Sequence, residues 1–222
     1  MGRDIAIDTP HGLVDGWLAD PQGAPLGALV VLQEIFGVNE HIRSVTERFA
    51  ALGYLSLAPA LFDPVQGDVE LGYDEAGFTK GRELVQQLGF DRAVGVVGAA
   101  ARRLQTNGIR VGVVGYCWGG SVAFLANTRL GLPAVSYYGA RTMPVLDEPL
   151  RAPMLFHFGG RDDSTPPKDI EAHRAAHPDA EVHVYAEAGH AFNRDVDPRH
   201  FHAESAAQAL RHTLAFFEAH LP

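Results

Sequence analysis

The chain has 222 residues, of which 46% are hydrophobic and 20% charged, and its formal net charge is −9. This length suits one domain, so we expect residues 1–222 to form a single domain with room for a pocket in its core. The acidic excess opposes non-specific binding to nucleic acid or to an anionic membrane surface. No apolar run reaches the roughly 20 residues that cross a bilayer, and no secretory signal pattern stands at the start. A lone cysteine fits a reducing compartment, so we expect a cytoplasmic protein.

The first third of the chain predicts strands around one amphipathic helix. Residues 4–18 have the pattern of a hairpin, which would add antiparallel edge strands to a sheet. Apolar strands are predicted at 28–33 and 53–58, and a helix at 41–52, where Ile42, Val45 and Phe49 share a face. Residues 59–78 contain several glycines and prolines and predict an irregular excursion over the sheet edge.

The remaining two thirds alternate short apolar runs with segments of helical period. Helices are predicted at 90–104, 119–130, 166–177 and 203–220, and strands at 110–114, 134–138, 153–158 and 181–186. Strand–helix alternation predicts an α/β fold with a mostly parallel central sheet and helices on both of its faces.

The most informative segment follows the strand at 110–114. There a small residue, a nucleophile and a second small residue alternate at the start of a helical pattern, in the order Gly115-Tyr116-Cys117-Trp118-Gly119-Gly120. This is the nucleophile elbow of an α/β-hydrolase fold, with Cys117 as nucleophile. Glycines are needed because the turn is sharp, and the helix N-terminus favours the thiolate. Alternatively, Cys117 is a small buried side chain filling a tight joint.

Two partners follow in the order that this fold requires. Asp162 comes after the strand at 153–158 and is the predicted acid, although Asp162 or Asp163 could instead cap the next helix. His190 lies between the last strand and the terminal helix and is the predicted base. A loop histidine that bonds backbone carbonyls is the alternative. Together the three residues predict nucleophilic ester hydrolysis.

Over nearly its whole length the sequence resembles the dienelactone hydrolase family. Three motifs carry this resemblance: Gln33-Glu34-Ile35-Phe36-Gly37, the segment around Cys117, and Gly189-His190-Ala191-Phe192-Asn193-Arg194. The resemblance implies a Cys-His-Asp carboxylic ester hydrolase of the carboxymethylenebutenolidase type, which opens an enol-lactone in the breakdown of aromatic compounds. It also implies that no cofactor is needed and that the protein is a monomer or a weak homodimer.

The resemblance assigns roles to residues around the nucleophile. Glu34 would help to switch the resting thiol to the reactive thiolate, which is plausible because a carboxylate repels a second negative charge. The alternative is that Glu34 pairs with an arginine such as Arg194 to hold two loops together. The backbone amides of Ile35 and Trp118 would form the oxyanion hole.

Two arginines would receive the carboxylate of the substrate. Arg194 matches the family's position four residues beyond the histidine, and a guanidinium suits bidentate capture of a carboxylate. A surface arginine is the ordinary alternative. The second family arginine has no unambiguous match; Arg82 is our assignment and Lys80 the fallback.

No metal site is predicted. His173 and His177 have the spacing that lets two imidazoles share a metal, but their helix lacks the associated glutamate and looks solvent-facing. Two rivals to the lactone hydrolase remain open. One is a broader carboxylesterase or thioesterase with the same triad; the other is a non-catalytic binding protein, in which the sulfur of Cys117 would lie out of reach of His190.

Overall fold

The computed structural model describes residues 2–105 and 108–221. The chain divides into two compact units, residues 1–113 with 221–222 and residues 114–220. The strand β5 (Val111–Tyr116) begins in the first and ends in the second. The prediction of one domain over 1–222 therefore stays a prediction, and each unit is described by itself.

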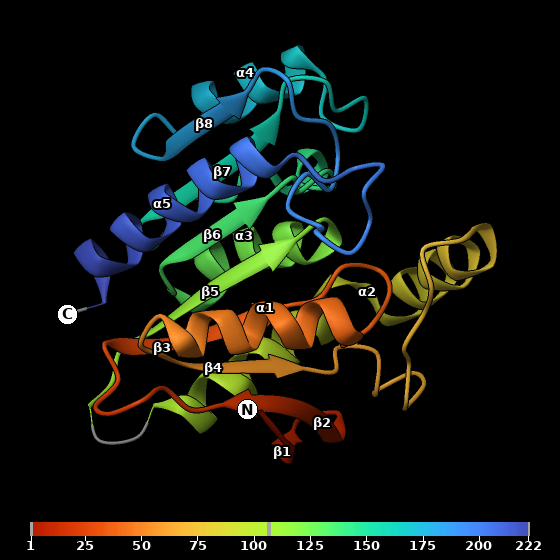
Figure 1. The fold of residues 1–222 in the computed structure, drawn as a ribbon, viewed down its shortest axis with the longest axis vertical. Coiled ribbons are helices and arrows are strands. Elements are labelled where there is room, and N and C mark those ends of the chain that lie inside the picture. Colours follow the sequence, from red (N-terminus) through yellow and green to blue (C-terminus); the bar gives the residue numbers. More distant parts are fainter. Residues whose placement is uncertain (1, 106–107, 222) are drawn as a thin grey trace. The chain divides into compact units, whose positions relative to one another are not determined.

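The first unit is a small mixed sheet with one helix on each face (Figure 1). Its four strands run in the order β1-β2-β4-β3, with β1, β2 and β4 paired antiparallel and β3 parallel to β4. The strands are β1 (Arg3–Thr9), β2 (Gly12–Ala19), β3 (Gly27–Leu32) and β4 (Tyr54–Pro59), and the helices are α1 (Glu40–Ala51) and α2 (Glu75–Leu104). Every residue of β3 is buried, as expected of a strand covered on both faces.

The second unit contains three parallel strands in the order β6-β7-β8, with α3 and α5 on opposite faces (Figure 1). Its strands are β6 (Ala134–Tyr137), β7 (Met154–Gly159) and β8 (Glu181–Tyr185). Its helices are α3 (Trp118–Leu130), α4 (Pro167–Ala176), α5 (Ala203–His220) and the short 3-10 turn η1 (Met143–Val145). The loops after β5, β7 and β8 carry the predicted nucleophile, acid and base.

Helix α2 is the main departure from the sequence-based expectation. It begins at Glu75, whereas only residues 90–104 were predicted to be helical. Asp74 caps its start, because the side-chain carboxylate accepts a hydrogen bond of 2.8 Å from the Gly77 amide. The helix is broken at Gly89, where φ is 70°. Two of the buried positions in its first half are Gly77 and Gly81, which a pattern-based analysis takes as helix breakers.

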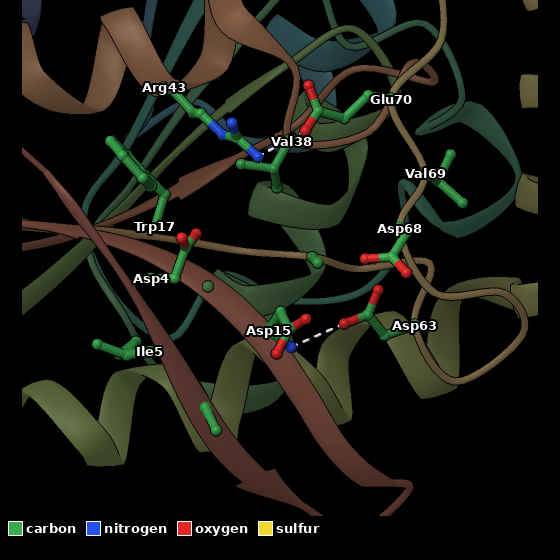
Figure 2. Close-up of a pocket in the computed structure, with 13 residues that line it drawn as sticks. Asp4, Ile5, Asp15, Trp17, Val38, Arg43, Asp63, Asp68, Val69 and Glu70 are labelled. Carbon is green, nitrogen blue, oxygen red and sulfur yellow. Dashed lines mark hydrogen bonds and ion pairs between the residues drawn. The ribbon is translucent and has the colours of Figure 1, made fainter.

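The first unit also holds a cavity of about 570 Å³ between the β1–β2 hairpin and the irregular segment before α2 (Figure 2). Acidic side chains dominate its lining: Asp4, Asp15, Asp63, Asp68 and Glu70. Trp17 and Arg43 also line the cavity. The Arg43 guanidinium lies over the Trp17 ring, with its carbon 5.1 Å from the ring centroid. No member of the predicted triad lines this cavity.

Candidate active site

Cys117 occupies a strained turn between β5 and α3. Its φ is 54° and its ψ −120°, a conformation that costs a non-glycine residue energy and persists only where the surroundings enforce it. The Cys117 amide donates a 3.0 Å hydrogen bond to the Tyr137 carbonyl oxygen at the end of β6. The side chain is half-buried, so the alternative of a buried packing residue is not favoured.

The glycines of the elbow are explained by close approach of backbone to backbone. A Cβ on Gly115 would lie 2.0 Å from the Gly119 carbonyl oxygen. A Cβ on Gly120 would lie 2.8 Å from the Tyr137 carbonyl oxygen. Neither carbonyl can rotate away as a side chain could, so only glycine allows α3 to start directly after β5.

The loops after β7 and β8 bring an acid and a base to this sulfur. His190 Nε2 lies 3.1 Å from Cys117 Sγ, and His190 Nδ1 donates a 2.8 Å hydrogen bond to Asp162 Oδ2. The three side chains thus form a hydrogen-bonded chain with the imidazole in the middle, which is the geometry of a nucleophile–base–acid triad. In a non-catalytic binding protein we expect the Cys117 sulfur to lie out of reach of His190. In this structure it lies within reach.

The structure separates the two neighbouring aspartates. The Asp162 side chain is inaccessible to solvent and also accepts a 2.8 Å hydrogen bond from the Ser164 amide. Asp163 is exposed. Neither caps the following helix, because the N-cap of α4 is Pro166 and no side-chain cap is present there. The alternative that one of these aspartates caps the helix is therefore wrong, and Asp162 instead faces His190 as expected.

The electrostatics of the triad favour a charged pair. Burial by itself lowers the pKa of His190, but the Cys117 sulfur and the Asp162 carboxylate outweigh it and raise that pKa to about 10. Burial likewise acts to raise the pKa of Asp162, and the hydrogen bond from His190 overcomes it, so the Asp162 pKa is lowered. This arrangement favours the imidazolium form of His190, so a proton is available at Nε2 next to the sulfur.

Tyr138 is a residue of this site that the sequence analysis missed. Its ring meets the His190 imidazole edge-on at 5.2 Å between centroids and the Phe192 ring at 5.3 Å. Its φ is 41°, a further strained position directly after β6. The only sequence signal for Tyr138 is its position at the end of a predicted strand. The Tyr138 ring therefore packs against one side of the His190 imidazole and limits its rotation.

Arg194 is buried, with 2% of its side chain exposed, so the alternative of a surface arginine is wrong. Its Nη1 lies 3.3 Å from Asp197 Oδ2, and Asp197 is itself 4% exposed. Arg199 Nε at 3.1 Å and His200 Nδ1 at 2.7 Å complete the partners of this carboxylate. Burial acts to raise the pKa of Asp197, but hydrogen bonds from Arg199 and His200 lower it to about 2. No sequence pattern marked Asp197, because its partners meet only in the folded loop.

Four of the predicted site residues belong to the first unit, so their placement relative to Cys117 stays a prediction. Glu34 and Ile35 follow directly after β3 and are both buried. Arg82 lies in the first half of α2 and is exposed, whereas Lys80 lines a shallow hollow with acidic residues including Asp74 and Glu83. Trp118, by contrast, is the first residue of α3, where helix amides lack intrahelical partners.

Most of the helix with His173 and His177 faces solvent as expected, but the two histidines themselves are buried. His173 is 1% exposed and His177 6% exposed. His173 Nδ1 donates to the Asp169 carbonyl oxygen at 2.7 Å, and Nε2 lies 2.6 Å from the Thr142 hydroxyl. Within residues 2–105 and 108–221, no group of three or more His, Cys, Asp or Glu side chains could hold a metal ion. Nor does this part of the chain contain a helix with the length and apolar character of a membrane span.

Comparisons with known proteins place this geometry in a family. The family described as "Dienelactone hydrolase family" matches residues 14–221. A Klebsiella pneumoniae crystal structure named "Putative Dienelactone Hydrolase" superposes with a TM-score of 0.86 at 32% identity, covering 98% of each chain. The chain is 34% identical to a Pseudomonas putida protein named "Carboxymethylenebutenolidase" (97% of this chain, 96% of the relative). It is 38% identical to a Yersinia pestis "Putative carboxymethylenebutenolidase" (90% and 81%).

The mixed, mostly parallel strands and the elbow define an α/β-hydrolase fold, as the sequence predicted. Within that fold class, the chain belongs to the dienelactone hydrolase family and is a hydrolase of that family.

Proposed function

We propose that this protein is a cysteine-dependent carboxylic ester hydrolase that opens small enol-lactones, in the manner of a carboxymethylenebutenolidase. One observation carries the proposal: Cys117 Sγ, His190 and Asp162 are linked by contacts of 3.1 and 2.8 Å on loops that follow three strands. A thiolate on a helix N-terminus beside an imidazolium is a nucleophile at neutral pH.

The reaction proceeds in two halves. The Cys117 thiolate attacks the lactone carbonyl, and the resulting oxyanion is held by the backbone amides of Trp118 and Ile35. The ring carbon–oxygen bond breaks, leaving a thioester, and the enolate oxygen departs with the proton of His190 Nε2, which leaves His190 neutral. Neutral His190 then removes a proton from water, the hydroxide attacks the thioester, and the product acid leaves as the thiolate is restored.

The substrate is a small lactone that bears a carboxylate. Arg194 and Arg82 are the proposed carboxylate anchors, and Glu34 is the group that helps to switch the Cys117 thiol to the reactive thiolate when substrate binds. Support for Arg194 comes from the similarity to a carboxymethylenebutenolidase and from the place of Arg194 in the loop that carries His190.

A broader carboxylesterase or thioesterase activity is the second candidate. The burial of Arg194, 2% exposed and engaged with Asp197, favours it, because an anchor that is already paired offers less to an anionic substrate. The same triad would then act on neutral esters.

The test is turnover of cis- and trans-dienelactone and of p-nitrophenyl esters by purified Cys117→Ala and by the wild type. We expect at least a thousandfold loss of kcat/KM in the variant, because no other nucleophile is present at the elbow. Alkylation of the wild-type thiol should abolish the same activity. Full activity of Cys117→Ala would refute the proposal, and faster turnover of neutral esters than of either lactone would favour the second candidate.

A further inference from the structure

The segment with the predicted oxyanion donor Ile35 is held by neighbours on several sides. Gln33 stands at its start with its side chain wholly buried. Gln33 Oε1 accepts a 3.0 Å hydrogen bond from the Leu61 amide, and Gln33 Nε2 donates to the Glu34 carbonyl oxygen at 3.4 Å. The Glu34 carbonyl and the Ile35 N–H belong to one planar peptide group, so fixing the carbonyl also fixes the direction of the N–H.

The far end of this segment is fixed by the chain that precedes α2. The Leu71 amide donates a 2.8 Å hydrogen bond to the Phe36 carbonyl oxygen, and Gly37 and Glu70 form an isolated antiparallel bridge. Gly37 has a φ of +83°, and a Cβ there would lie 1.8 Å from the Val69 carbonyl oxygen. Figure 2 shows Val69 and Glu70 on this stretch of chain, beside the cavity that Val38 also lines.

Ile35 itself is approached by the backbone of α2 at Gly81. A Cβ on Gly81 would lie 2.2 Å from the Ile35 carbonyl oxygen and 3.1 Å from both the Ile35 carbonyl carbon and the Ile35 Cβ. Gly81 is on the buried face of the helix half that precedes the break at Gly89. Because Gly81 has no side chain, the helix can contact the peptide group that joins Ile35 to Phe36.

We propose that Gly81 is a positioning residue for the reaction: through the Ile35 carbonyl and the Ile35 Cβ it fixes the position of Ile35, and so the aim of the oxyanion-binding N–H at the other side of that residue. The inference rests on the proposed function, in which the Ile35 amide binds the oxyanion. Gly81 does not touch substrate; it acts through Ile35.

The physical reason is that the nearest atom at this contact belongs to the backbone and not to the end of a flexible side chain. An added methyl group would meet a backbone oxygen, which no change of rotamer can move aside. Either the peptide at Ile35 shifts or α2 moves away from it. Oxyanion donors work only when they point at the position of the developing charge, and a displacement of about 1 Å can cost a hundredfold in rate.

The test is a comparison of Gly81→Ala with the wild type in three measurements: kcat, KM and the rate of Cys117 alkylation by iodoacetamide. We expect kcat on the ester or lactone substrate to fall about 10- to 100-fold, with KM within about threefold. The alkylation rate should stay within about twofold, because it reports the Cys117–His190 pair and needs no oxyanion hole.

Gly95→Ala is the matched control in the same helix. Its Cβ would meet only the end of the exposed His11 side chain, at 2.7 Å, which can move away. We expect no change in kcat. Gln33→Met acts on the preceding peptide, which joins Glu34 to Ile35 and carries the Ile35 N–H, without touching α2, and should give the same loss of kcat with unchanged alkylation.

The outcomes separate this inference from the proposed function. Unchanged kcat in Gly81→Ala, or kcat and alkylation that fall in proportion, would overturn the inference. If Gly81→Ala does not fold, Gln33→Met decides by the same criteria. Full activity of Cys117→Ala would instead overturn the proposed function, whatever the glycine variant does.

Discussion

At the scale of single residues, the chemistry depends on an imidazole placed between the Cys117 sulfur and the Asp162 carboxylate. His190 is 26% exposed at its side chain, yet the Asp162 carboxylate behind it is inaccessible to solvent. The carboxylate therefore acts across a short, poorly screened distance, and its charge has a strong effect on the proton affinity of the ring.

This placement predicts the alkaline limb of the pH profile. The pKa of His190 is raised to about 10, so the imidazolium is retained through neutral pH and kcat/KM should fall as the pH rises through about 10. Asp162→Asn removes one of the charges that raise the pKa, so the limb should move to lower pH while kcat falls. The measurement is kcat/KM from pH 6 to 10.5. The neighbouring variant Asp163→Asn should keep the wild-type limb; an unmoved limb in Asp162→Asn would contradict the assignment.

The elbow glycine gives a prediction for stability. Gly115→Ala would place a Cβ 2.0 Å from the Gly119 carbonyl oxygen, so the elbow must open. We expect a loss of about 3 kcal/mol in the free energy of unfolding, together with loss of turnover. Urea denaturation measures the first quantity. Gly67→Ala is the control, because a Cβ there meets nothing within 4 Å. Equal stability of the two variants would show that the elbow can accommodate a Cβ at position 115.

At the scale of elements, a hydrogen bond joins the segment between β4 and α2 to the β1–β2 hairpin. Its acceptor is a partly buried carboxylate that lies near other carboxylates, which is electrostatically unfavourable. Asp63 Oδ2 accepts a 2.7 Å hydrogen bond from the Asp15 amide (Figure 2). Burial raises the pKa of Asp63 to about 6, and the nearby Asp15 and Asp68 carboxylates act in the same direction. Ionisation of Asp63 thus destabilises this part of the fold.

Asp63→Asn should therefore stabilise the protein at neutral pH. An acid whose folded pKa is raised binds more protons in the folded state, so the contribution of Asp63 to stability falls as the pH rises from about 4 to about 6, opposite in sign to that of the buried histidines. Asparagine can still accept the Asp15 hydrogen bond but cannot ionise. After screening by solvent, the expected gain at pH 7.5 is on the order of 1 kcal/mol, vanishing near pH 4. Thermal unfolding at both pH values checks it. Asp8→Asn, at an exposed site, should give no such difference; a gain that persists at pH 4 would argue against the electrostatic cause.

At the scale of the whole molecule, buried neutral histidines determine how the protein responds to acid. Burial is the main cause that lowers the pKa of four of them: His157, His173, His177 and His212. His157 is fully buried and hydrogen-bonded to the Tyr185 and Thr213 hydroxyls at 2.9 and 3.0 Å. In the unfolded chain the same imidazoles bind protons below a pH of about 6.5.

Stability should therefore fall as the pH falls from 6.5 to 5. The unfolded state takes up more protons in this window, and each histidine that stays neutral contributes up to about 1.4 kcal/mol per pH unit. Urea denaturation across the window gives the slope. His212→Gln should make this slope smaller, whereas His11→Gln, at an exposed position, should leave it unchanged. A wild-type stability that does not change between pH 5 and 6.5 would contradict this account.

Much of the fold and of the candidate site was accessible from the sequence alone. The strands and most helices were predicted within a few residues, because apolar periodicity is a local property of the chain. Cys117, Asp162 and His190 were found because each follows a predicted strand, in the order that the fold requires. The first half of α2 was missed because two of its buried positions are glycines, which indicate a helix only when something packs against them.

Other features were decided only by tertiary structure. The choice of Asp162 over Asp163 and the burial of Arg194 depend on which segments meet in the fold, and no local pattern encodes that. The same is true of Gly81, whose role depends on a backbone oxygen 46 residues earlier in the chain. Periodicity and turn chemistry act over a few residues, so the sequence by itself determined the elements and the reactive side chains. Burial, pKa and close backbone contact arise between distant segments, so they needed the folded chain.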